Sequence, residues 1–255
     1  MFSAKTKLRI AMMALALVFG GNAASAQSSA EIQELRKELA ALKAGQLEMQ
    51  KTLQAIKDAL MGKAPALEAV YITTAAAMKM GSEKAPLVMV EFSDYQCPFC
   101  GRFATTTFDS LVNEYVKTGK VQYAFKNFPL RDIHPYAQKA AEAAECMGEQ
   151  GRYWEAHEKL FWNQQALEAN DLVRYAEELG LDVPKFQMCF DGSKYVAKVN
   201  ADLAEGLKLD VRGTPGFFLG YRDPKDPSRM QAVKFINGAV PLEEFKQTID
   251  ALLKR

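Results

Sequence analysis

Histidine is scarce in this sequence: only His134 and His157 occur among 255 residues. This scarcity excludes a histidine-rich metal centre, and four cysteines are too few for a small scaffold held together by many disulfides. Neither sign of charge is in clear excess, because the chain has 32 Lys and Arg and 31 Asp and Glu. The composition therefore gives no sign of a basic surface for nucleic acid. With 49% hydrophobic and 25% charged residues, the chain has the balance of a globular protein, with room for one large domain and appendages.

Residues 1–26 contain the three parts of a secretory signal peptide in order. Three basic residues precede an apolar stretch at residues 10–19, and Ala24-Ser25-Ala26 supplies small residues for cleavage. Ten residues rise only about 15 Å as a helix, against a hydrocarbon core of roughly 30 Å, so a membrane anchor is not favoured. We therefore predict an exported mature chain, with 29 Lys and Arg against 31 Asp and Glu, in a compartment where disulfides persist.

Residues 27–62 are rich in Ala, Leu, Glu, Lys and Gln and contain neither proline nor cysteine. Apolar residues recur there at alternating intervals of three and four, at Ile32, Leu35, Leu39, Leu42, Met49, Leu53, Ile56 and Leu60, with Gln46 at the remaining seam position. This 3.5-residue period predicts a coiled-coil stalk through which the chain forms a homo-oligomer, a dimer or a trimer. A single amphipathic helix packed on its own domain is the alternative.

The stalk is followed by a predicted linker at residues 63–80, with one possible short strand at residues 70–73. The folded body, residues 81–255, begins with an apolar run at residues 87–92. A short continuous run of this kind is typical of a strand that is buried on both faces of a sheet.

Hydrophobic periodicity and Gly, Pro and Asn signals define the rest of the body. The expected elements are a helix at 98–117, a strand at 121–125, helices at 135–148, 153–164 and 170–180, two segments near Pro184 and Lys194, strands at 217–219 and 232–236, and a last helix from Pro241. Strand signals are missing from about residue 130 to 207. We therefore predict an α+β fold with a helical insertion at about 130–207.

The chemistry is concentrated at Cys97-Pro98-Phe99-Cys100, where the buried strand gives way to a helix. A single Cys-x-x-Cys is either a redox dithiol or half of a zinc site, but here the other two cysteines stand alone and neither histidine has ligand spacing. Backbone N–H groups and the macrodipole at a helix N-terminus stabilise a thiolate, and proline at the first helical position removes no hydrogen bond. We expect Cys97 to be the exposed nucleophile and Cys100 the inner, resolving thiol, joined by a reversible Cys97–Cys100 disulfide. A purely stabilising staple is less favoured, because a four-residue loop gives little entropic stabilisation.

Two motifs resemble the DsbA-like branch of the thioredoxin superfamily. The first is VEFSDYQCPFC at residues 90–100, and the second is GTPGFF at residues 213–218. The resemblance covers residues 81–255 and implies a thioredoxin fold with an all-helical insertion. It also implies a periplasmic thiol–disulfide oxidoreductase that uses no cofactor or metal and acts on exported proteins through mixed disulfides. The stalk is similar to that of oligomeric relatives, several of which shuffle disulfides rather than only introduce them.

The resemblance extends to positions beside the two cysteines. It implies that Glu91 is a buried acid that helps to move the proton of the inner thiol; an acid on an edge strand is the alternative. Pro215 matches the family's cis-proline, which faces the active site and exposes backbone groups of Thr214 for pairing with an extended substrate. Phe99 departs from members that carry histidine between the cysteines, so we expect a less stabilised Cys97 thiolate and a less extreme oxidant.

Cys146 and Cys189 both fall in the helical insertion. They are either buried free thiols or a structural disulfide, and an oxidising compartment favours the disulfide. Relatives with cysteines at similar places pair them, so the resemblance implies a Cys146–Cys189 bond. His134 and His157 are expected to be structural rather than catalytic.

Oligomerisation favours an isomerase, because tethered active sites hold one misfolded substrate at a high effective concentration. A disulfide-donating oxidase is the alternative, and either activity needs a membrane redox partner that the sequence does not identify. A copper(I)-binding tolerance protein is a candidate from another class, since two closely spaced thiolates suit a soft ion. A structural surface protein assembled through its coiled coil is the third candidate.

Overall fold

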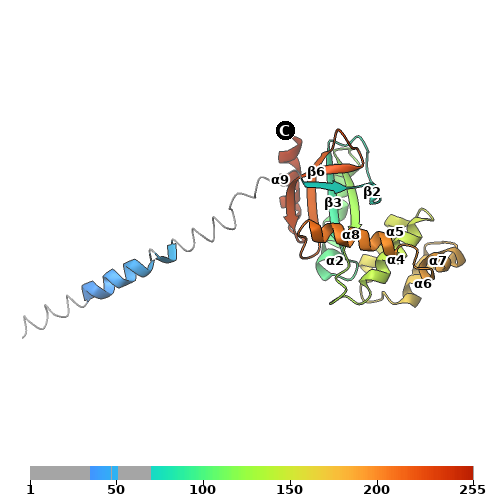
Figure 1. The fold of residues 1–255 in the computed structure, drawn as a ribbon, viewed down its shortest axis with the longest axis horizontal. Coiled ribbons are helices and arrows are strands. Elements are labelled where there is room, and N and C mark those ends of the chain that lie inside the picture. Colours follow the sequence, from blue (N-terminus) through green and yellow to red (C-terminus); the bar gives the residue numbers. More distant parts are fainter. Residues whose placement is uncertain (1–34, 47, 51–69, 255) are drawn as a thin grey trace, which may run out of the picture. The chain divides into compact units, whose positions relative to one another are not determined.

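The structure is a computed structural model that describes residues 35–46, 48–50 and 70–254. The chain divides into two units, Met1–Ala66 and Leu67–Arg255, and each is described by itself (Figure 1). The predicted signal peptide at residues 1–26 lies outside the described residues.

The described part of the first unit is helical, at residues 35–46 and 48–50. Its apolar seam residues are each more than half exposed within this single chain: Leu35, Leu39, Leu42 and Met49. A narrow apolar stripe with this spacing is what a coiled coil buries between chains. The other apolar seam residues lie outside the described ranges, and oligomerisation through residues 27–62 stays a prediction.

The second unit is built on a six-stranded mixed sheet with the strand order β1-β6-β5-β3-β4-β2. The strands are β1 (Val70–Thr73), β2 (Met78–Met80), β3 (Leu87–Ser93), β4 (Val121–Asn127), β5 (Gly216–Arg222) and β6 (Arg229–Asn237). Central β3 runs parallel to β4 and antiparallel to β5. The outer strands β1 and β2 pair with β6 and β4. The possible strand at residues 70–73 is therefore confirmed, and residues 78–80, expected within the linker, form a second edge strand. Their partners are distant in sequence, and local composition does not encode such pairing.

Both faces of β3 are buried. Successive residues of a strand point to opposite faces, and Leu87 and Met89 join one core cluster while Val88, Val90 and Phe92 join another. A strand covered on both faces needs apolar residues without alternation. The prediction of a buried strand here is therefore confirmed.

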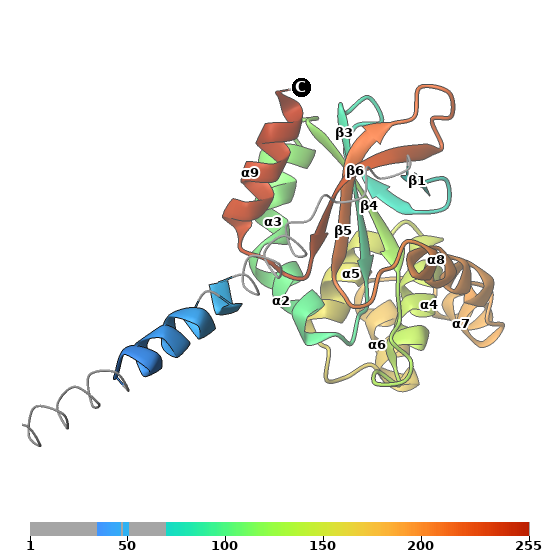
Figure 2. The ribbon, with the colours of Figure 1, turned by 60° about the vertical axis from the view of Figure 1, so that its left-hand side comes forward.

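The helices are α2 (Pro98–Thr106), α3 (Phe108–Leu111), the π-helical turn η1 (Val112–Val116), α4 (Ala137–Gly148), α5 (Tyr153–Trp162), α6 (Ala169–Glu178), α7 (Val183–Asp191), α8 (Val196–Lys208) and α9 (Leu242–Leu253). Helices α4 to α8 follow one another between β4 and β5, and Figure 2 shows them gathered at one end of the sheet. The predicted α+β fold with a helical insertion is confirmed. Among the described residues, no helix combines the length and the hydropathy needed to span a membrane.

The single helix expected over residues 98–117 is interrupted at Thr107. This residue has φ −120° and ψ −38°, between the end of α2 and the start of α3. The hydroxyls of Thr105 and Thr106 donate to backbone carbonyls four residues earlier, at 2.8 and 2.7 Å. Such bonds compete with the helical ladder and bend helices, so a run of three threonines explains a break that apolar periodicity alone does not predict.

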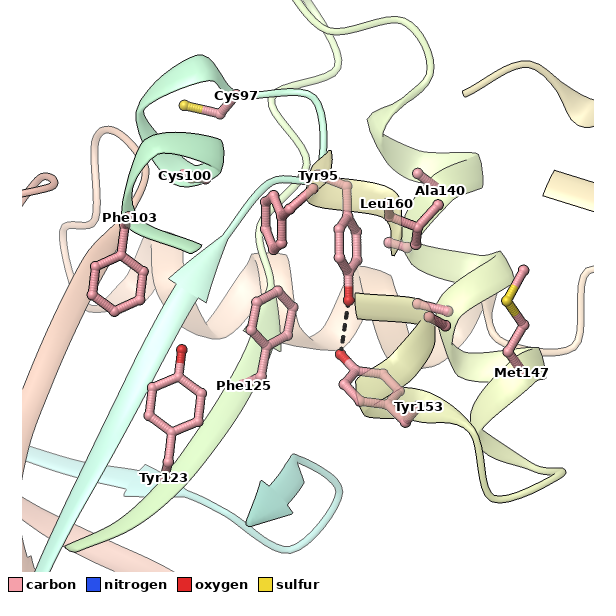
Figure 3. Packing of buried hydrophobic residues seen from close by; sticks show 14 of the residues in the cluster. Tyr95, Cys97, Cys100, Phe103, Tyr123, Phe125, Ala140, Met147, Tyr153 and Leu160 are labelled. Atoms are coloured by element: carbon pink, nitrogen blue, oxygen red, sulfur yellow. Dashed lines mark hydrogen bonds between the residues drawn. The ribbon is translucent and has the colours of Figure 1, made fainter. Parts of the chain in front are cut away.

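Aromatic side chains join the insertion to the sheet (Figure 3). The ring centroid of Tyr95 lies 5.5 Å from that of Phe125 on β4 and 4.8 Å from that of Phe161 on α5. The Tyr95 hydroxyl donates to the Tyr153 hydroxyl at 3.2 Å. All four side chains are buried, and burial of each aromatic ring stabilises the fold by about 2 kcal/mol. Packing from both sides therefore fixes the segment that leads to Cys97.

Candidate active site

The turn between β3 and α2 places Cys97 at the start of a helix. Asp94 organises this turn, because its backbone carbonyl accepts the N–H of Cys97 at 3.1 Å. The Asp94 carboxylate accepts the N–H groups of Gln96 and Leu130 at 2.7 and 2.8 Å, and it lies 2.8 Å from Nδ1 of His134. His134 thus contributes to holding the turn.

Cys97 is the residue immediately before α2, and Pro98 occupies the first helical position. The pKa of the Cys97 thiol is lowered to about 6, first by a hydrogen bond from the Cys100 thiol. Burial opposes this effect, whereas the Thr214 side chain and two backbone N–H groups at the start of α2 add to it. Unpaired N–H groups at a helix start favour an anion, so the position of Cys97 before α2 adds to the effect of the Cys100 thiol.

Cys97 is less accessible than the sequence predicted, with only 4% of the residue exposed. Its Sγ lies 3.4 Å from the carbonyl oxygen of Thr214 and donates to it in the thiol form. The segment around Thr214 therefore covers the sulfur, through a contact between residues 117 positions apart. Figure 3 shows Cys97 at the margin of the buried cluster, one helical turn before Cys100.

Cys100 is fully buried, and its pKa is raised well above the usual range. Burial is the main cause, followed by the hydrogen bond and the charge of Cys97 and by the charge of Glu91. The pKa values of the two thiols are thus shifted in opposite directions. Both are free thiols in this structure, which corresponds to the reduced dithiol state.

Glu91 lies on the central strand β3 and is 1% exposed. The alternative of an edge-strand acid is therefore wrong. Burial raises the pKa of Glu91 to about 8, a Ser93 hydrogen bond opposes the rise, and the Cys97 charge adds to it. The Tyr123 hydroxyl donates to the Glu91 carboxyl group. Near neutral pH this group is therefore able both to accept and to release a proton.

The peptide bond between Thr214 and Pro215 is cis. The carbonyl of Pro215 accepts the N–H of Gly238 at 2.8 Å. The next residue, Gly216, begins β5 and is paired with Phe92 of β3. Sheet pairing therefore sets the Thr214–Pro215 segment beside the end of β3, where the Cys97 turn begins.

Phe99 is 55% exposed on α2. The guanidinium carbon of Arg102 lies 5.2 Å from the Phe99 ring centroid, within cation–π range. The Phe99 side chain is thus apolar and faces solvent, and it presents no polar donor to the Cys97 sulfur.

Cys146 of α4 and Cys189 of α7 form a disulfide. Their Cα atoms are 5.8 Å apart, and both residues are buried. This bond joins two helices of the insertion, at a sequence separation of 43.

His157 is 2% exposed among aromatic rings, and burial lowers its pKa to about 3. The imidazole is therefore neutral at physiological pH, which fits a packing role. Within residues 35–46, 48–50 and 70–254, no group of three or more His, Cys, Asp or Glu side chains is arranged to hold a metal ion.

Asp94 and Gln164 belong to the site, although neither was expected there from the sequence. The Gln164 Nε2 donates to the carbonyls of Tyr95 and Cys97, at 2.9 and 2.8 Å. Gln164 and Cys97 are 67 positions apart in the sequence, so no local sequence pattern predicts this contact. Asp94 carries a local signal, since Asp and Asn commonly accept the N–H two residues on in turns.

A buried strand that delivers a Cys-Pro-Phe-Cys turn to a helix N-terminus, beside a cis-proline, defines a dithiol protein of thioredoxin type. A thioredoxin family model matches residues 73–251. The chain therefore belongs to the thioredoxin family.

Solved structures support the DsbA-like resemblance. The chain is similar to alpha-DsbA1 of Wolbachia pipientis, with 25% identity and a TM-score of 0.61 over 70% of this chain and 92% of that chain. It shares the fold of oxidised BdbD from Bacillus subtilis, with 23% identity and a TM-score of 0.61 over 73% of this chain and 99% of that one.

Curated sequences give a different kind of match. The chain is 38% identical over 153 residues to the Na(+)/H(+) antiporter NhaA 3 of Salinispora tropica, which is 60% of this chain and 23% of the antiporter. The chain thus spans less than a quarter of the length of this relative. The antiporter sequence contains a segment similar to 60% of this chain.

Proposed function

We propose that this protein is a thiol–disulfide oxidoreductase in which Cys97 is the nucleophile and Cys100 the resolving thiol. The observation that carries the proposal is the opposite shift in pKa of two thiols one helical turn apart, lowered to about 6 for Cys97 and raised for Cys100. The thiolate is the attacking species in disulfide exchange. Near neutral pH the outer sulfur is therefore reactive while the inner one stays protonated.

In the reducing direction, the Cys97 thiolate attacks one sulfur of a substrate disulfide, and the other substrate sulfur leaves as a thiolate. Cys100 then loses its proton and attacks the Cys97 sulfur of the mixed disulfide. The second substrate thiolate leaves, and the Cys97–Cys100 disulfide remains. Oxidation of a substrate dithiol follows the same steps in reverse, so each turnover moves two electrons.

Glu91 is the proposed acceptor of the Cys100 proton. Its charge raises the pKa of Cys100, and its own pKa of about 8 suits proton exchange near neutral pH. Glu91 lies on β3, the strand that leads into the turn carrying the two cysteines. A carboxylate held there removes the proton that Cys100 must lose before it attacks.

We further propose that the substrates are exported proteins and that the compartment is the periplasm. The signal-peptide pattern of residues 1–26 and the Cys146–Cys189 disulfide support this. The segment around Thr214 and Pro215 is the proposed docking strand for an extended substrate. A membrane redox partner is proposed to restore the Cys97–Cys100 pair after each cycle.

Disulfide isomerisation is the favoured activity, with oligomerisation through residues 27–62. The exposed apolar stripe of residues 35–49 supports association between chains. Repair of scrambled ribonuclease tests this, with the full chain compared with a chain lacking residues 27–62. We expect the deletion to give a monomer with much weaker repair but intact Cys97 reactivity. Unchanged repair by a monomer would remove the argument from the stalk.

A disulfide-donating oxidase is the second candidate. The low pKa of Cys97 favours it, because a stabilised thiolate makes the disulfide form more oxidising. The redox state of Cys97 and Cys100 in cells separates the two directions: a mainly reduced pair supports isomerisation, and a mainly oxidised pair supports donation.

A further inference from the structure

Gln164 is a residue of the helical insertion that binds the backbone of the active-site turn. Its Nε2 donates one hydrogen bond to the Tyr95 carbonyl at 2.9 Å and one to the Cys97 carbonyl at 2.8 Å. An amide nitrogen carries two hydrogens, so both are used on the two carbonyls that flank Gln96. The Cys97 carbonyl also accepts the N–H of Gly101 at 3.0 Å, the first helical bond of α2.

Gly101 makes room for this amide. A Cβ atom added at Gly101 would lie 2.1 Å from Oε1 of Gln164 and 2.6 Å from its Cδ. Contacts under 3.0 Å are not tolerated, so any larger residue at position 101 displaces either the amide or α2. The active-site helix is therefore shaped to accept a side chain from the insertion.

The position of Gln164 is set by the insertion itself. It lies in the turn after α5, where Ala166 N–H donates to the Asn163 carbonyl at 2.9 Å. The Ala166 carbonyl accepts the Tyr175 hydroxyl of α6 at 2.9 Å, and Leu167 is buried. A shift of α5 or α6 therefore moves the amide that holds the Cys97 carbonyl.

We propose that Gln164 is a positioning residue through which the helical insertion sets the reactivity of Cys97. The inference rests on the proposed function, because it concerns the same thiolate. The Cys97 carbonyl belongs to the peptide unit that begins α2, so its orientation determines how the Cys97 sulfur meets the N–H groups of the first helical turn.

The test is the pH profile of Cys97 alkylation in the full, reduced chain, followed on the peptide that contains Cys97. Gln164→Met keeps the length of the side chain but removes the donors. We expect it to raise the midpoint of the profile by about half a pKa unit or more, the effect of losing one or two ordinary hydrogen bonds. Gln164→Glu is expected to raise it further, because it adds a negative charge near the thiolate.

Gln150→Met is the matched control. The Gln150 side chain also joins two backbone groups of the insertion, donating to the Asp182 carbonyl at 3.2 Å and accepting the Asp182 N–H at 2.9 Å. It lies outside the active-site turn. We expect the control to leave the alkylation midpoint at the wild-type value, even if it costs as much stability as Gln164→Met.

Gly101→Ala provides a second, independent route to the same contact. It is expected to raise the midpoint in the wild-type background and to have a much smaller effect in a Gln164→Ala background, because the effects of substitutions at interacting residues are not additive.

The inference is overturned if folded Gln164→Met and Gly101→Ala chains both keep the wild-type midpoint. If Gln164→Met does not fold, the proposal is tested by Gly101→Ala in the wild-type and Gln164→Ala backgrounds. A wild-type midpoint at the value of an ordinary thiol would instead overturn the proposed function.

Discussion

The two cysteine pairs of this chain lie in the same folded unit and differ in spacing and in chemistry. Cys97 and Cys100 lie on one helical turn, carry free thiols and have pKa values shifted in opposite directions. Cys146 and Cys189 join two helices across 43 residues and are already oxidised. The first pair begins at a helix N-terminus, where backbone N–H groups lie near the Cys97 sulfur. The second pair connects α4 with α7.

This comparison teaches that the reactivity of a cysteine pair depends on its secondary-structure position more than on its burial. Both pairs are buried, with Cys97 at 4% and Cys189 at 6% exposure. Only Cys97 stands at a helix start, which stabilises its thiolate and makes it a good leaving group. The pair in the insertion has no comparable device, and its long loop makes it valuable for stability instead.

The largest expected effect is on activity. Cys97→Ser removes the attacking thiolate and should reduce disulfide exchange with a peptide disulfide to the uncatalysed rate. The double variant Cys146→Ala, Cys189→Ala should retain most of the activity. Equal losses in both variants would show that the two pairs are not functionally distinct.

The next effect concerns stability. Removing the Cys146–Cys189 bond by the same double Ala variant should lower the free energy of unfolding by about 2–4 kcal/mol, because the bond restricts a long loop in the unfolded chain. Urea unfolding under non-reducing conditions measures this. Oxidation of Cys97 and Cys100 closes a far shorter loop and should stabilise the chain through chain entropy much less. An unchanged unfolding midpoint in the double variant would contradict the structural role of the second bond.

Glu91 sharpens the comparison, because this buried acid lies on the strand that leads to the reactive pair. Its folded pKa of about 8 lies above its unfolded value near 4.5. Below pH 4.5 both states are protonated, and between pH 4.5 and 8 the unfolded state loses its proton first. The stability of the wild-type chain therefore falls as the pH rises through this window.

We compare the free energy of unfolding of Glu91→Gln with that of wild type. The difference should shift in favour of Glu91→Gln by roughly 3 kcal/mol as the pH rises from 5 to 8. Unfolding free energies at the two pH values measure the difference, with exposed Glu83→Gln as the control. A Glu91→Gln chain with the same pH dependence as wild type would show that Glu91 ionises normally.

The smallest expected effect is at Phe99, one of the two residues between the reactive cysteines. Phe99→His introduces a polar donor beside the start of α2, and it should lower the pKa of Cys97 by about half a pKa unit and make the disulfide more oxidising. Equilibration with glutathione measures the second effect. Phe99→Leu is the apolar control and should resemble wild type; a shift of the same size in Leu would contradict a role for the polar donor.

The sequence predicted those parts of the molecule that short-range patterns encode. The apolar run of β3, the capping of the helices by glycine and the Cys-Pro-Phe-Cys turn are contiguous, so they are readable without the fold. Resemblance to a known family supplied the roles of Glu91 and Pro215, although a charge within the apolar run of residues 87–92 already favours a buried Glu91.

Features that depend on distant contacts were not predicted. Edge strand β2 was not expected, and the possible strand at residues 70–73 was expected without its partner, because both edge strands pair with residues far along the chain. Cys97 is nearly fully buried because the Thr214 segment covers its sulfur. The Cys97 carbonyl accepts a hydrogen bond from Gln164, which is 67 residues away in the sequence. The break at Thr107 is different, because the three threonines carried a local signal that apolar periodicity concealed.

The central claim is that Cys97 is held as a thiolate at the start of α2. The most direct test is the rate of iodoacetamide modification of Cys97 in the reduced, full chain as a function of pH. The account predicts a rate that rises to half its maximum near pH 6. A rate that rises only above about pH 8, as for an ordinary cysteine, would contradict it.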